Sequence, residues 1–321
     1  SVAWVTVVFE AELGLLRLQA RSMARFLAAE AVSEIIVVAN SPNTSKLAAK
    51  IRAFASDYGP HQEKLRIISP TQFFEGPNSI NHVLPALRAL ARRVLRPVRI
   101  GRGSNWRGYS GWHIQQAMKI AVARYIKSET IVYLDAKNHF VLMSSASDVV
   151  TLNGTPRARL ERGHDNRDWD QAARAYFDLP PVDQDYLLPP SITPFVCNTK
   201  TVRHTLDYVE SKSGPIEYFF VRGQPRGTEF TLMSAAAALL KREPESGLLP
   251  FESALRGASD DQFSSIIAKA RNGDLRMIGT HRAVLKSLSP ELIEEVIELW
   301  SEIGLVKSSD EAKTLLQDVL P

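Results

Sequence analysis

The chain is nearly free of cysteine, with Cys197 as the one thiol among 321 residues. A single cysteine excludes a disulfide framework and a zinc site built from several thiolates, and it is typical of a reducing compartment. No stretch approaches the roughly 18 consecutive apolar residues that indicate a membrane-spanning helix. The first apolar segment, Val2 to Phe9, follows no basic stretch and leads into a charged helix, so we expect a strand and not a signal peptide. These absences together predict a cytoplasmic protein.

Acidic residues are absent between Gly76 and Ser128, while the same block carries ten lysines and arginines. Because the whole chain carries a net charge of +4, the remainder sums to −6. Such a block generates a positive field that attracts an anionic ligand, although a solvated helix face followed by a loop gives the same pattern. Nucleic acid is not expected as the partner, because the sequence has no recognisable binding motif. The ten cations are Arg88, Arg92, Arg93, Arg96, Arg99, Arg102, Arg107, Lys119, Arg124 and Lys127.

Apolar residues make up 45% of the chain and charged residues 23%, which is ordinary for a globular protein. In the first 70 residues, apolar runs typical of buried strands alternate with segments whose apolar residues have helical spacing. Strands are expected at 2–9, 34–40 and 65–69, and helices at 12–29 and 45–56. This order predicts an α/β fold with a mainly parallel sheet flanked by helices. Ligands of such sheets bind outside the carboxyl ends of the strands, where Phe9, Glu10 and Asn40 lie. Taken singly, each of these three is better explained as a capping or turn residue.

Further elements are expected in the rest of the chain. Helices are predicted at 85–96, 111–127, 200–210, 228–240, 290–303 and 311–320, the last with a capping box formed by Ser308 and Glu311. Strands are predicted at 130–134, 195–198 and 275–279, with more sheet around a turn at 149–156 and a helix within the acidic segment 161–185. Residues 99–111 are rich in glycine and arginine but lack the spacing of a phosphate-binding loop. We expect a mobile loop there, whose Arg99, Arg102 and Arg107 close over a bound anion.

Asp135 is the most informative single position. It ends a strongly apolar strand that needs no carboxylate for packing, at the edge where a sheet binds its ligand. An aspartate there either holds a metal or a sugar hydroxyl, or caps a turn, and spacing alone leaves the two open. On the helix before it, Trp112, Gln115, Gln116 and Lys119 recur at spacings of three and four, near one face. The glutamines either bond sugar hydroxyls or cover the helix, and Trp112 is expected in the core.

Two segments carry a resemblance to a known family. Residues 111–119 (Gly-Trp-His-Ile-Gln-Gln-Ala-Met-Lys) and 133–140 (Tyr-Leu-Asp-Ala-Lys-Asn-His-Phe) resemble a bacterial family of GT-A-type glycosyltransferase-like proteins, much of it catalogued as a domain of unknown function associated with cell-surface polysaccharide genes. Thr193-Pro-Phe195, Thr228-Glu-Phe230 and Gly279-Thr-His-Arg282 follow in the order expected for that family. The resemblance runs from Val5 to about Leu305. It implies one GT-A-like, Rossmann-related domain whose residues 1–140 bind a nucleotide sugar and 141–282 the acceptor, with a C-terminal helical hairpin at 283–321.

The resemblance implies transfer of a sugar from a nucleotide-diphosphate donor, in which an acidic turn after the central strand holds a divalent metal and the diphosphate. Asp135 matches the first acid of that turn, but Lys137 stands where the second acid is expected, with Asn138 beside it. One carboxylate and a lysine make a poor Mg²⁺ or Mn²⁺ site, because hard cations prefer several anionic oxygens. Lys137 is then expected to neutralise the diphosphate directly. The alternative keeps the metal on Asp135, Asn138 and His281.

The resemblance also implies roles for the neighbours of this turn. Lys119, Lys137 and the arginines of 99–107 are the cations available to the leaving diphosphate. Glu229 matches the family's Thr-Glu-Phe position and is the candidate base or acceptor contact. An acid in the first turn of a helix is, however, also favoured by the helix dipole alone. The expected donor contacts are Phe9, Glu10, Asn40, Trp112, Gln115, Gln116, Lys119, Asp135, Lys137 and Asn138.

Three functions are therefore considered for the chain. The first is a glycosyltransferase acting on a cell-surface glycan or its lipid-linked precursor, with a nucleotide-sugar donor. The second is a non-catalytic nucleotide- or polyanion-binding module, which the lysine at position 137 keeps open. The third, a sugar-nucleotidyl transferase, is disfavoured because no glycine-rich basic signature follows the first strand. The basic helix expected at 85–96 also suggests a peripheral contact with an anionic membrane at its inner face.

Overall fold

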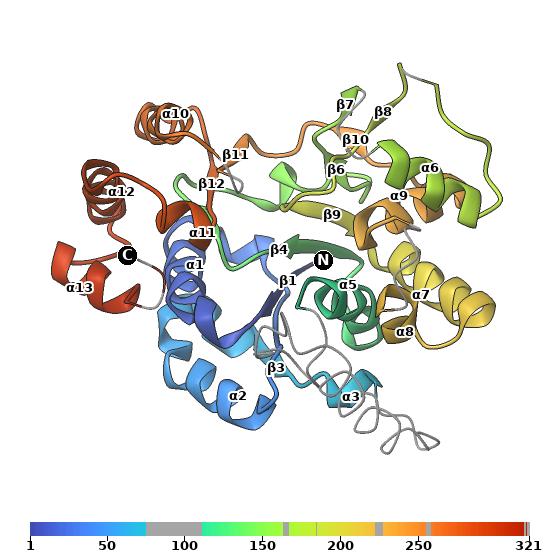
Figure 1. Cartoon of the computed structure of the whole chain (residues 1–321), viewed down its shortest axis with the longest axis horizontal. Helices are drawn as coiled ribbons and strands as arrows, with labels where there is room; N and C mark the ends of the chain where they lie inside the picture. Colours follow the sequence, from blue (N-terminus) through green and yellow to red (C-terminus); the bar gives the residue numbers. More distant parts are fainter. Residues whose placement is uncertain are drawn as a thin grey trace, which may run out of the picture.

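The computed structural model describes residues 1–74, 111–162, 167–183, 185–221, 227–254, 258–317 and 319. These residues form a mixed α/β structure in which helices cover both faces of a five-stranded central sheet (Figure 1). Four of the five strands run parallel. The expected fold class, a mainly parallel sheet flanked by helices and followed by C-terminal helices, is confirmed.

The central sheet reverses its strand order at β1. Its strands are β1 (Val2–Val8), β2 (Glu34–Ala39), β3 (Leu65–Ile68), β4 (Thr130–Leu134) and β9 (Phe195–Asn198), in the order β3-β2-β1-β4-β9. The chain moves outward from β1 to β3 and then returns to place β4 on the other side of β1. β9 pairs antiparallel with β4 and closes that edge. The boundary between β1 and β4 is therefore the topological switch point, where open α/β sheets bind their ligands.

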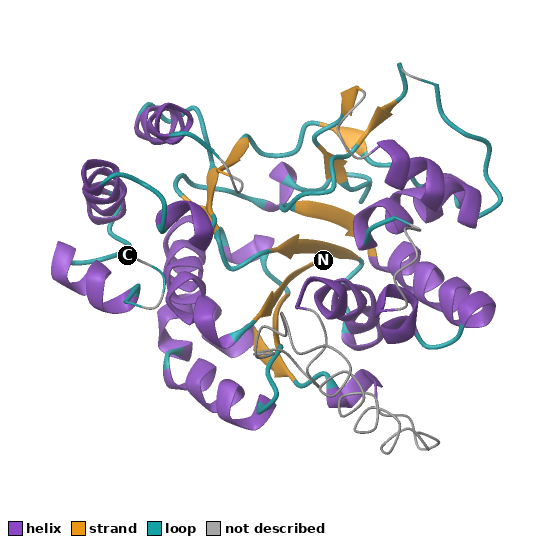
Figure 2. Cartoon of the chain, viewed as in Figure 1, coloured by secondary structure: helices purple, strands orange, loops and turns teal. Residues whose placement is uncertain are grey.

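Both faces of this sheet are buried, which explains why its strands are continuous apolar runs. In β1, Trp4 and Val8 pack into one hydrophobic cluster, while Val5 and Val7 pack into a second cluster on the opposite face. Figure 2 shows the helices on either side of the strands. The first cluster includes residues of α1 (Leu13–Phe26) and α2 (Thr44–Ala53), and the second includes residues of α5 (Gly111–Ala121), α7 (Thr199–Ser213) and α9 (Glu229–Leu239).

Side-chain caps fix where several helices begin. Thr228, Ser259 and Ser289 each accept a backbone N–H from the residue three positions later, at the starts of α9, α10 (Asp260–Arg271) and α12 (Pro290–Glu302). The starts expected near 228 and 290 coincide with two of these caps. The other α-helices of the described residues are α3 (Thr71–Phe74), α6 (Arg167–Tyr176), α8 (Ile216–Val221), α11 (Arg282–Leu285) and α13 (Ser309–Leu315).

A second sheet supports the turn that follows β4. It consists of β5 (Asn138–Phe140), β11 (Phe251–Ala254) and β12 (Met277–Thr280), in the order β11-β12-β5. Its register sets Gly279 opposite Asn138, so a strand far along the chain fixes the residues next to Asp135. Two short pairs complete the strands, β6 (Arg157–Ala158) with β10 (Glu245–Ser246) and β7 (Glu161–Arg162) with β8 (Leu187–Leu188).

Two local expectations are wrong. The segment 149–156 adds no sheet strand, because it makes only one bridge, between Val150 and Pro156, around a turn in which Gly154 has φ +81°. The α-helix that begins at Gly111 ends at Ala121 and continues as a 3-10 turn over Val122–Tyr125, so it is shorter than predicted.

The last helix also starts differently from the prediction. Ser308 caps α13 by accepting the Glu311 N–H at 3.2 Å, as expected. The Glu311 carboxylate, however, accepts the N–H of Lys307 at 2.6 Å and not that of Ser308, so the capping box is only half formed. The helix predicted at 85–96 and the loop predicted at 99–111 lie outside the described residues, apart from Gly111.

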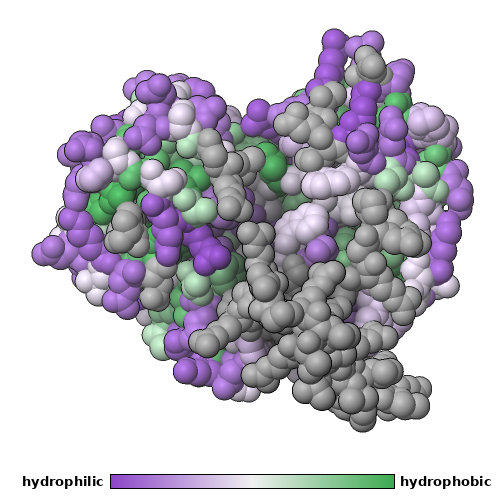
Figure 3. All heavy atoms as spheres, viewed as in Figure 1, coloured by the Kyte–Doolittle hydropathy of each residue, from purple (hydrophilic) through white to green (hydrophobic). Residues whose placement is uncertain are grey.

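The surface is hydrophilic over much of the view in Figure 3. The outline is hollowed between the part that carries α10 and the part that carries the β7–β8 pair (Figure 3). None of the helices in the described part of the chain is long and apolar enough to cross a bilayer.

Candidate functional site

Asp135 lies at the topological switch point of the central sheet. It follows β4 directly, and the segment from Phe9 to Glu12 follows β1, the parallel neighbour of β4. The register pairs Thr6 with Leu134, so the two chain segments leave the sheet side by side. Asp135 therefore stands at the edge where the sequence predicts a ligand.

Hydrogen bonds from two elements hold the turn after β4. Gln19 on α1 donates from Nε2 to the carbonyl oxygens of Asp135 at 2.7 Å and Asn138 at 3.1 Å, and its Oε1 accepts from the Thr6 hydroxyl at 2.8 Å. Asn138 Oδ1 accepts the Asp135 N–H at 2.8 Å, and its Nδ2 donates to the Thr193 carbonyl at 3.4 Å. The Asn138 side chain is buried, with both polar atoms engaged inside the protein. The Asn138 side chain therefore stabilises the turn that follows β4.

Two lysines bracket the Asp135 carboxylate. Lys119 Nζ lies 3.1 Å from Asp135 Oδ1, and Lys137 Nζ lies 3.1 Å from Asp135 Oδ2. The Thr193 hydroxyl donates to the same Oδ2 at 3.0 Å. Lys119 also lies 3.1 Å from Glu229 Oε1, in a pair that is almost fully buried. The side chains of Asp135 and Lys137 are 25% and 12% exposed, so solvent reaches the group on their side.

Burial and pairing compete in setting the charges of this group. Burial alone would raise the pKa of Asp135, but the ammoniums of Lys119 and Lys137 outweigh it and hold that pKa well below its usual range. Burial outweighs the pairing of Glu229 with Lys119, so the pKa of Glu229 is raised. Burial opposes the charge on Lys119, but its two carboxylate partners raise the pKa above the ordinary value. Asp135 is therefore ionised and Lys119 protonated near neutral pH.

Glu229 reaches this group from a distant part of the chain. Thr228 caps α9, so Glu229 occupies the first helical position, and its backbone N–H donates to Gln116 Oε1 at 3.2 Å. Lys119 Nζ also lies 4.6 Å from the centre of the Phe230 ring, a cation–π distance. Gln116, Lys119 and Glu229 were each predicted as site residues from separate segments. The structure brings them together, because the first turn of α9 packs against α5.

Glu12 belongs to the same group of charges, although sequence reasoning does not single it out. Burial and the nearby Asp135 carboxylate raise its pKa to about 8, against the opposing influence of Arg282 and the two lysines. Glu12 therefore holds a proton at neutral pH. Arg282 lies with its guanidinium carbon 4.7 Å from the centre of the Phe9 ring, beside the end of β1. Its position in the sequence could have indicated this role, because Glu12 is an acidic residue that follows a buried strand within a few positions.

Gln115 and Trp112 extend the site along α5. Gln115 Nε2 is 3.5 Å from Asp135 Oδ1. Trp112 is 52% exposed, so the expectation that it lies in the core is wrong. Its position in the first turn of α5 sets its ring beside that of Trp169 on α6, with 6.0 Å between the ring centres, instead of beneath a neighbouring helix.

Two other expected donor contacts, Glu10 and Asn40, have partners outside the group of Lys119, Asp135 and Lys137. Glu10 is exposed and pairs with Lys50 of α2, which lowers the pKa of Glu10. Asn40 is buried at the end of β2, where its N–H donates to the Val8 carbonyl at 2.8 Å. Arg99, Arg102 and Arg107 lie outside the described residues.

The metal set of Asp135, Asn138 and His281 does not fit a divalent cation in this arrangement. Both oxygens of Asp135 face lysine ammoniums, and Asn138 Oδ1 holds a backbone N–H. His281 Nδ1 caps α11 by accepting the N–H of Ala283 at 3.1 Å. A dication at Asp135 would meet two positive charges at short range. Among the residues that the structure describes, no group of three or more His, Cys, Asp or Glu side chains is placed to hold a metal.

Comparisons with known proteins place the chain in a family. No curated protein matches its sequence. A solved structure of the bifunctional glycosyltransferase WbbM in its apo form overlaps with a TM-score of 0.48 and 11% identity, covering 99% of this chain and 52% of that one. The chain thus spans about half the length of that protein. The model of DUF6492, a family of unknown function, matches residues 9–246, which include the whole group from Glu12 to Glu229. The chain belongs to the DUF6492 family.

Proposed function

We propose that this chain is a glycosyltransferase that moves a sugar from a nucleotide-diphosphate donor to a hydroxyl of a cell-surface glycan or its lipid-linked precursor. The observation that carries the proposal is the Lys119–Asp135–Lys137 group at the switch point of the sheet. It combines the edge at which such sheets bind nucleotides with one lysine that solvent reaches, Lys137, whose side chain is 12% exposed. The resemblance of residues 111–119 and 133–140 supports the same assignment.

Lys137 is the proposed partner of the donor diphosphate. A nucleoside diphosphate leaves readily only when the negative charge that develops on it is stabilised. Asp135 orients the Lys137 ammonium at 3.1 Å on the solvent side of the group. Asp135 and Glu229 together offset Lys119 and Lys137, so the surplus positive charge near the group comes from Arg282, which also acts on Glu12.

Glu229 is the proposed proton acceptor for the attacking hydroxyl. A general base works best when its pKa approaches the working pH. Burial raises the pKa of Glu229, which makes it a stronger base than an exposed glutamate. Lys119 fixes one of its oxygens at 3.1 Å. Glu12 holds a proton at neutral pH and is therefore suited to donate a hydrogen bond, not to accept a proton.

Donor binding is further proposed to need no Mn²⁺ or Mg²⁺. The ammonium of Lys137 stands where the resemblance places a second metal-binding acid, and both oxygens of Asp135 already accept from cations. The positive charge that a metal would bring to the diphosphate is then supplied by side chains.

Thermal unfolding with a panel of UDP- and GDP-sugars tests the proposal. We expect one nucleotide to raise the Tm of the wild-type chain equally in EDTA and in Mn²⁺, by an amount equivalent to about 2.7 kcal/mol at 100 times its Kd. The ligand-induced shift should vanish in Lys137→Ala and Asp135→Ala. It should persist in Lys212→Ala, which removes an exposed lysine that also pairs with an aspartate at 3.2 Å.

Catalysis is tested by transfer or hydrolysis of the nucleotide that binds. Glu229→Gln should retain the shift in Tm and lose turnover. Binding without turnover of any donor would favour the non-catalytic module. A response of equal size to heparin, with steep salt dependence, would indicate a general polyanion binder. If no nucleotide shifts the Tm, the proposed function is wrong.

A further inference from the structure

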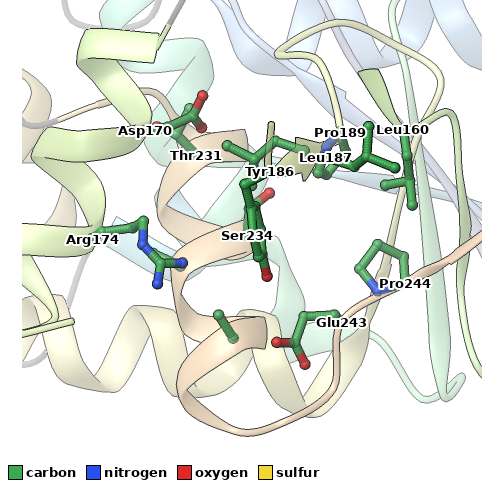
Figure 4. Close-up of a pocket in the computed structure, with 13 residues that line it drawn as sticks. Leu160, Asp170, Arg174, Tyr186, Leu187, Pro189, Thr231, Ser234, Glu243 and Pro244 are labelled. Atoms are coloured by element: carbon green, nitrogen blue, oxygen red, sulfur yellow. The ribbon is translucent and has the colours of Figure 1, made fainter. Parts of the chain in front are cut away.

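A pocket of about 200 Å³ lies on the face of α9 that is turned toward α6 (Figure 4). Thr231, Ser234, Ala235 and Ala238 line it from α9, at the spacing of one helix face. Asp170 and Arg174 line it from α6. The remaining walls come from three other segments, which contribute Leu160, then Tyr186, Leu187, Leu188 and Pro189, and then Glu243 and Pro244.

The lining is polar on one side and apolar on the other. Figure 4 shows Asp170, Arg174 and Ser234 on the side of the two helices, with Leu160, Leu187 and Pro189 across from them. A pyranose ring has the matching division, because its hydroxyls point outward from an edge while its C–H groups form an apolar face.

The polar side of the pocket offers anchored hydrogen-bonding groups. Arg174 is held by a bond from its Nε to the Pro180 carbonyl at 2.8 Å, and its guanidinium carbon lies 5.8 Å from the centre of the Tyr186 ring. The hydroxyl oxygen of Ser234 is buried and has no hydrogen-bond partner within the described residues. Asp170 adds a carboxyl group whose pKa burial raises to about 7.

Size and charge exclude the nucleotide donor from this pocket. At about 200 Å³ the volume falls below the roughly 300–1,000 Å³ of pockets that take drug-sized ligands, so it suits a single ring. Among the described residues that line the pocket, Asp170 and Glu243 offset Arg174, which leaves no surplus positive charge for a diphosphate. A single neutral ring with hydroxyl groups fits both the volume and the charge of this pocket.

The pocket is connected to the candidate site through α9 and α6. Gly227, at φ +96°, lets α6 approach the turn before α9, since a Cβ there would lie 3.0 Å from the Trp169 carbonyl oxygen and 3.1 Å from Ala173 Cβ. Thr231 of the pocket is two residues from Glu229, so the two side chains leave opposite sides of the same helical turn. The ring contact between Trp112 and Trp169 also joins α5 to α6.

We propose that this pocket is a carbohydrate subsite that holds one neutral sugar ring of the acceptor, at a distance from the hydroxyl that reacts. The inference rests on the proposed transfer reaction, because a transferase needs a second ligand beside its donor. Binding of a non-reacting ring is useful to such an enzyme, since remote binding energy positions the reacting group.

Ligand-observed NMR with the methyl glycosides of glucose, galactose, mannose, N-acetylglucosamine and rhamnose tests the subsite. We expect the wild-type chain to bind at least one glycoside and Ser234→Phe, which fills the pocket, to weaken that binding about tenfold or more. Tyr186→Ala truncates a side chain that is 39% exposed, so it should weaken binding without disturbing the core. Leu239→Phe is the matched control, because it adds a ring to a residue of α9 that is 39% exposed and does not line the pocket.

The outcomes separate this proposal from the proposed function. The Tm shift caused by the nucleotide should survive in Ser234→Phe, while glycoside binding should survive in Lys137→Ala. A wild-type chain that binds none of the five glycosides overturns the subsite, as does equal binding by wild type, Ser234→Phe and Tyr186→Ala. Glycoside binding without any nucleotide binding would support the subsite and remove the transferase.

Discussion

At the scale of single residues, one lysine joins two carboxylates that the sequence separates by almost one hundred positions. Lys119 lies 3.1 Å from both Asp135 and Glu229, and it is almost fully buried. A buried charge that loses its partner costs far more than an exposed one, because it has already given up its hydration. The same arrangement that organises the candidate site therefore makes it sensitive to substitution.

Asp135→Asn is expected to destabilise the fold by about 2–4 kcal/mol, since it removes the charge between two lysines without changing the shape of the side chain. Asp178→Asn is the matched control. Asp178 pairs with Lys212 at 3.2 Å on the surface, and asparagine tolerates its φ of +56°. Urea unfolding of both variants measures the difference. Equal stabilities would show that the buried ion pairs contribute nothing beyond surface pairs.

Glu12→Gln is expected to change how stability depends on pH. The folded-state pKa of about 8 lies above the ordinary 4.5, so the folded protein binds this proton more tightly than the unfolded chain. The stability contributed by the proton is full below about pH 4.5 and is lost as the pH rises toward 8. The variant should match the wild type near pH 4 and exceed it by about 2 kcal/mol near pH 9, a value reduced for partial exposure. Parallel pH curves in chemical unfolding would contradict the protonation of Glu12.

At the scale of elements, the small sheet of β5, β11 and β12 holds the turn that carries Lys137. Asn138 begins β5 and lies opposite Gly279 of β12, which in turn lies opposite Ser253 of β11. A Cβ at Gly279 would lie 2.2 Å from Ser253 Oγ and 2.8 Å from its Cβ, so only glycine allows the strands this approach. The close contact between β11 and β12 thus helps to position the turn that carries Asp135 and Lys137.

Gly279→Ala is expected to cost about 2–3 kcal/mol of stability, because the new methyl group forces β11 and β12 apart. The double variant Gly279→Ala/Ser253→Gly should recover most of this loss, since it removes both of the closest atoms. Ser253→Gly alone is the reference for a double-mutant cycle in chemical unfolding. Additive losses in that cycle would mean that the predicted steric contact does not form.

At the scale of the whole molecule, the C-terminal helices share a core with the first strand. Leu292, Val296 and Trp300 of α12 belong to the same buried cluster as Trp4 of β1. The Trp300 ring packs edge-on against His139 of β5, with 6.0 Å between ring centres. Figure 1 shows α12 and α13 at the outer side of α1, far from α6 and α7.

A chain that ends after Leu288 is therefore expected to lose cooperative unfolding, because it exposes the apolar surface that α12 and α13 cover. Differential scanning calorimetry and limited proteolysis measure this. Glu302→Ala is the control, since it removes only a partly exposed ion pair between α12 and Arg271 of α10 and should leave the Tm unchanged. A truncated chain that unfolds at the wild-type temperature would identify residues 289–321 as dispensable.

The sequence by itself determined the elements and one side of the site. Apolar runs and their spacing predicted the alternation of the first 70 residues, the approximate bounds of α9 and α12, and Asp135 at the end of a buried strand, because these signals are local. They also set Gln116 and Lys119 on one helix.

Only the tertiary structure decided which distant groups meet. The pairing of Lys119 with Glu229, 110 residues away, depends on how α9 packs beside α5, which no periodicity encodes. The proton on Glu12 depends on burial and on the Asp135 carboxylate that follows β4, and the exposure of Trp112 depends on the position of α6. The pocket at Ser234 is formed by five separate segments, and none of them predicts it by its own sequence pattern.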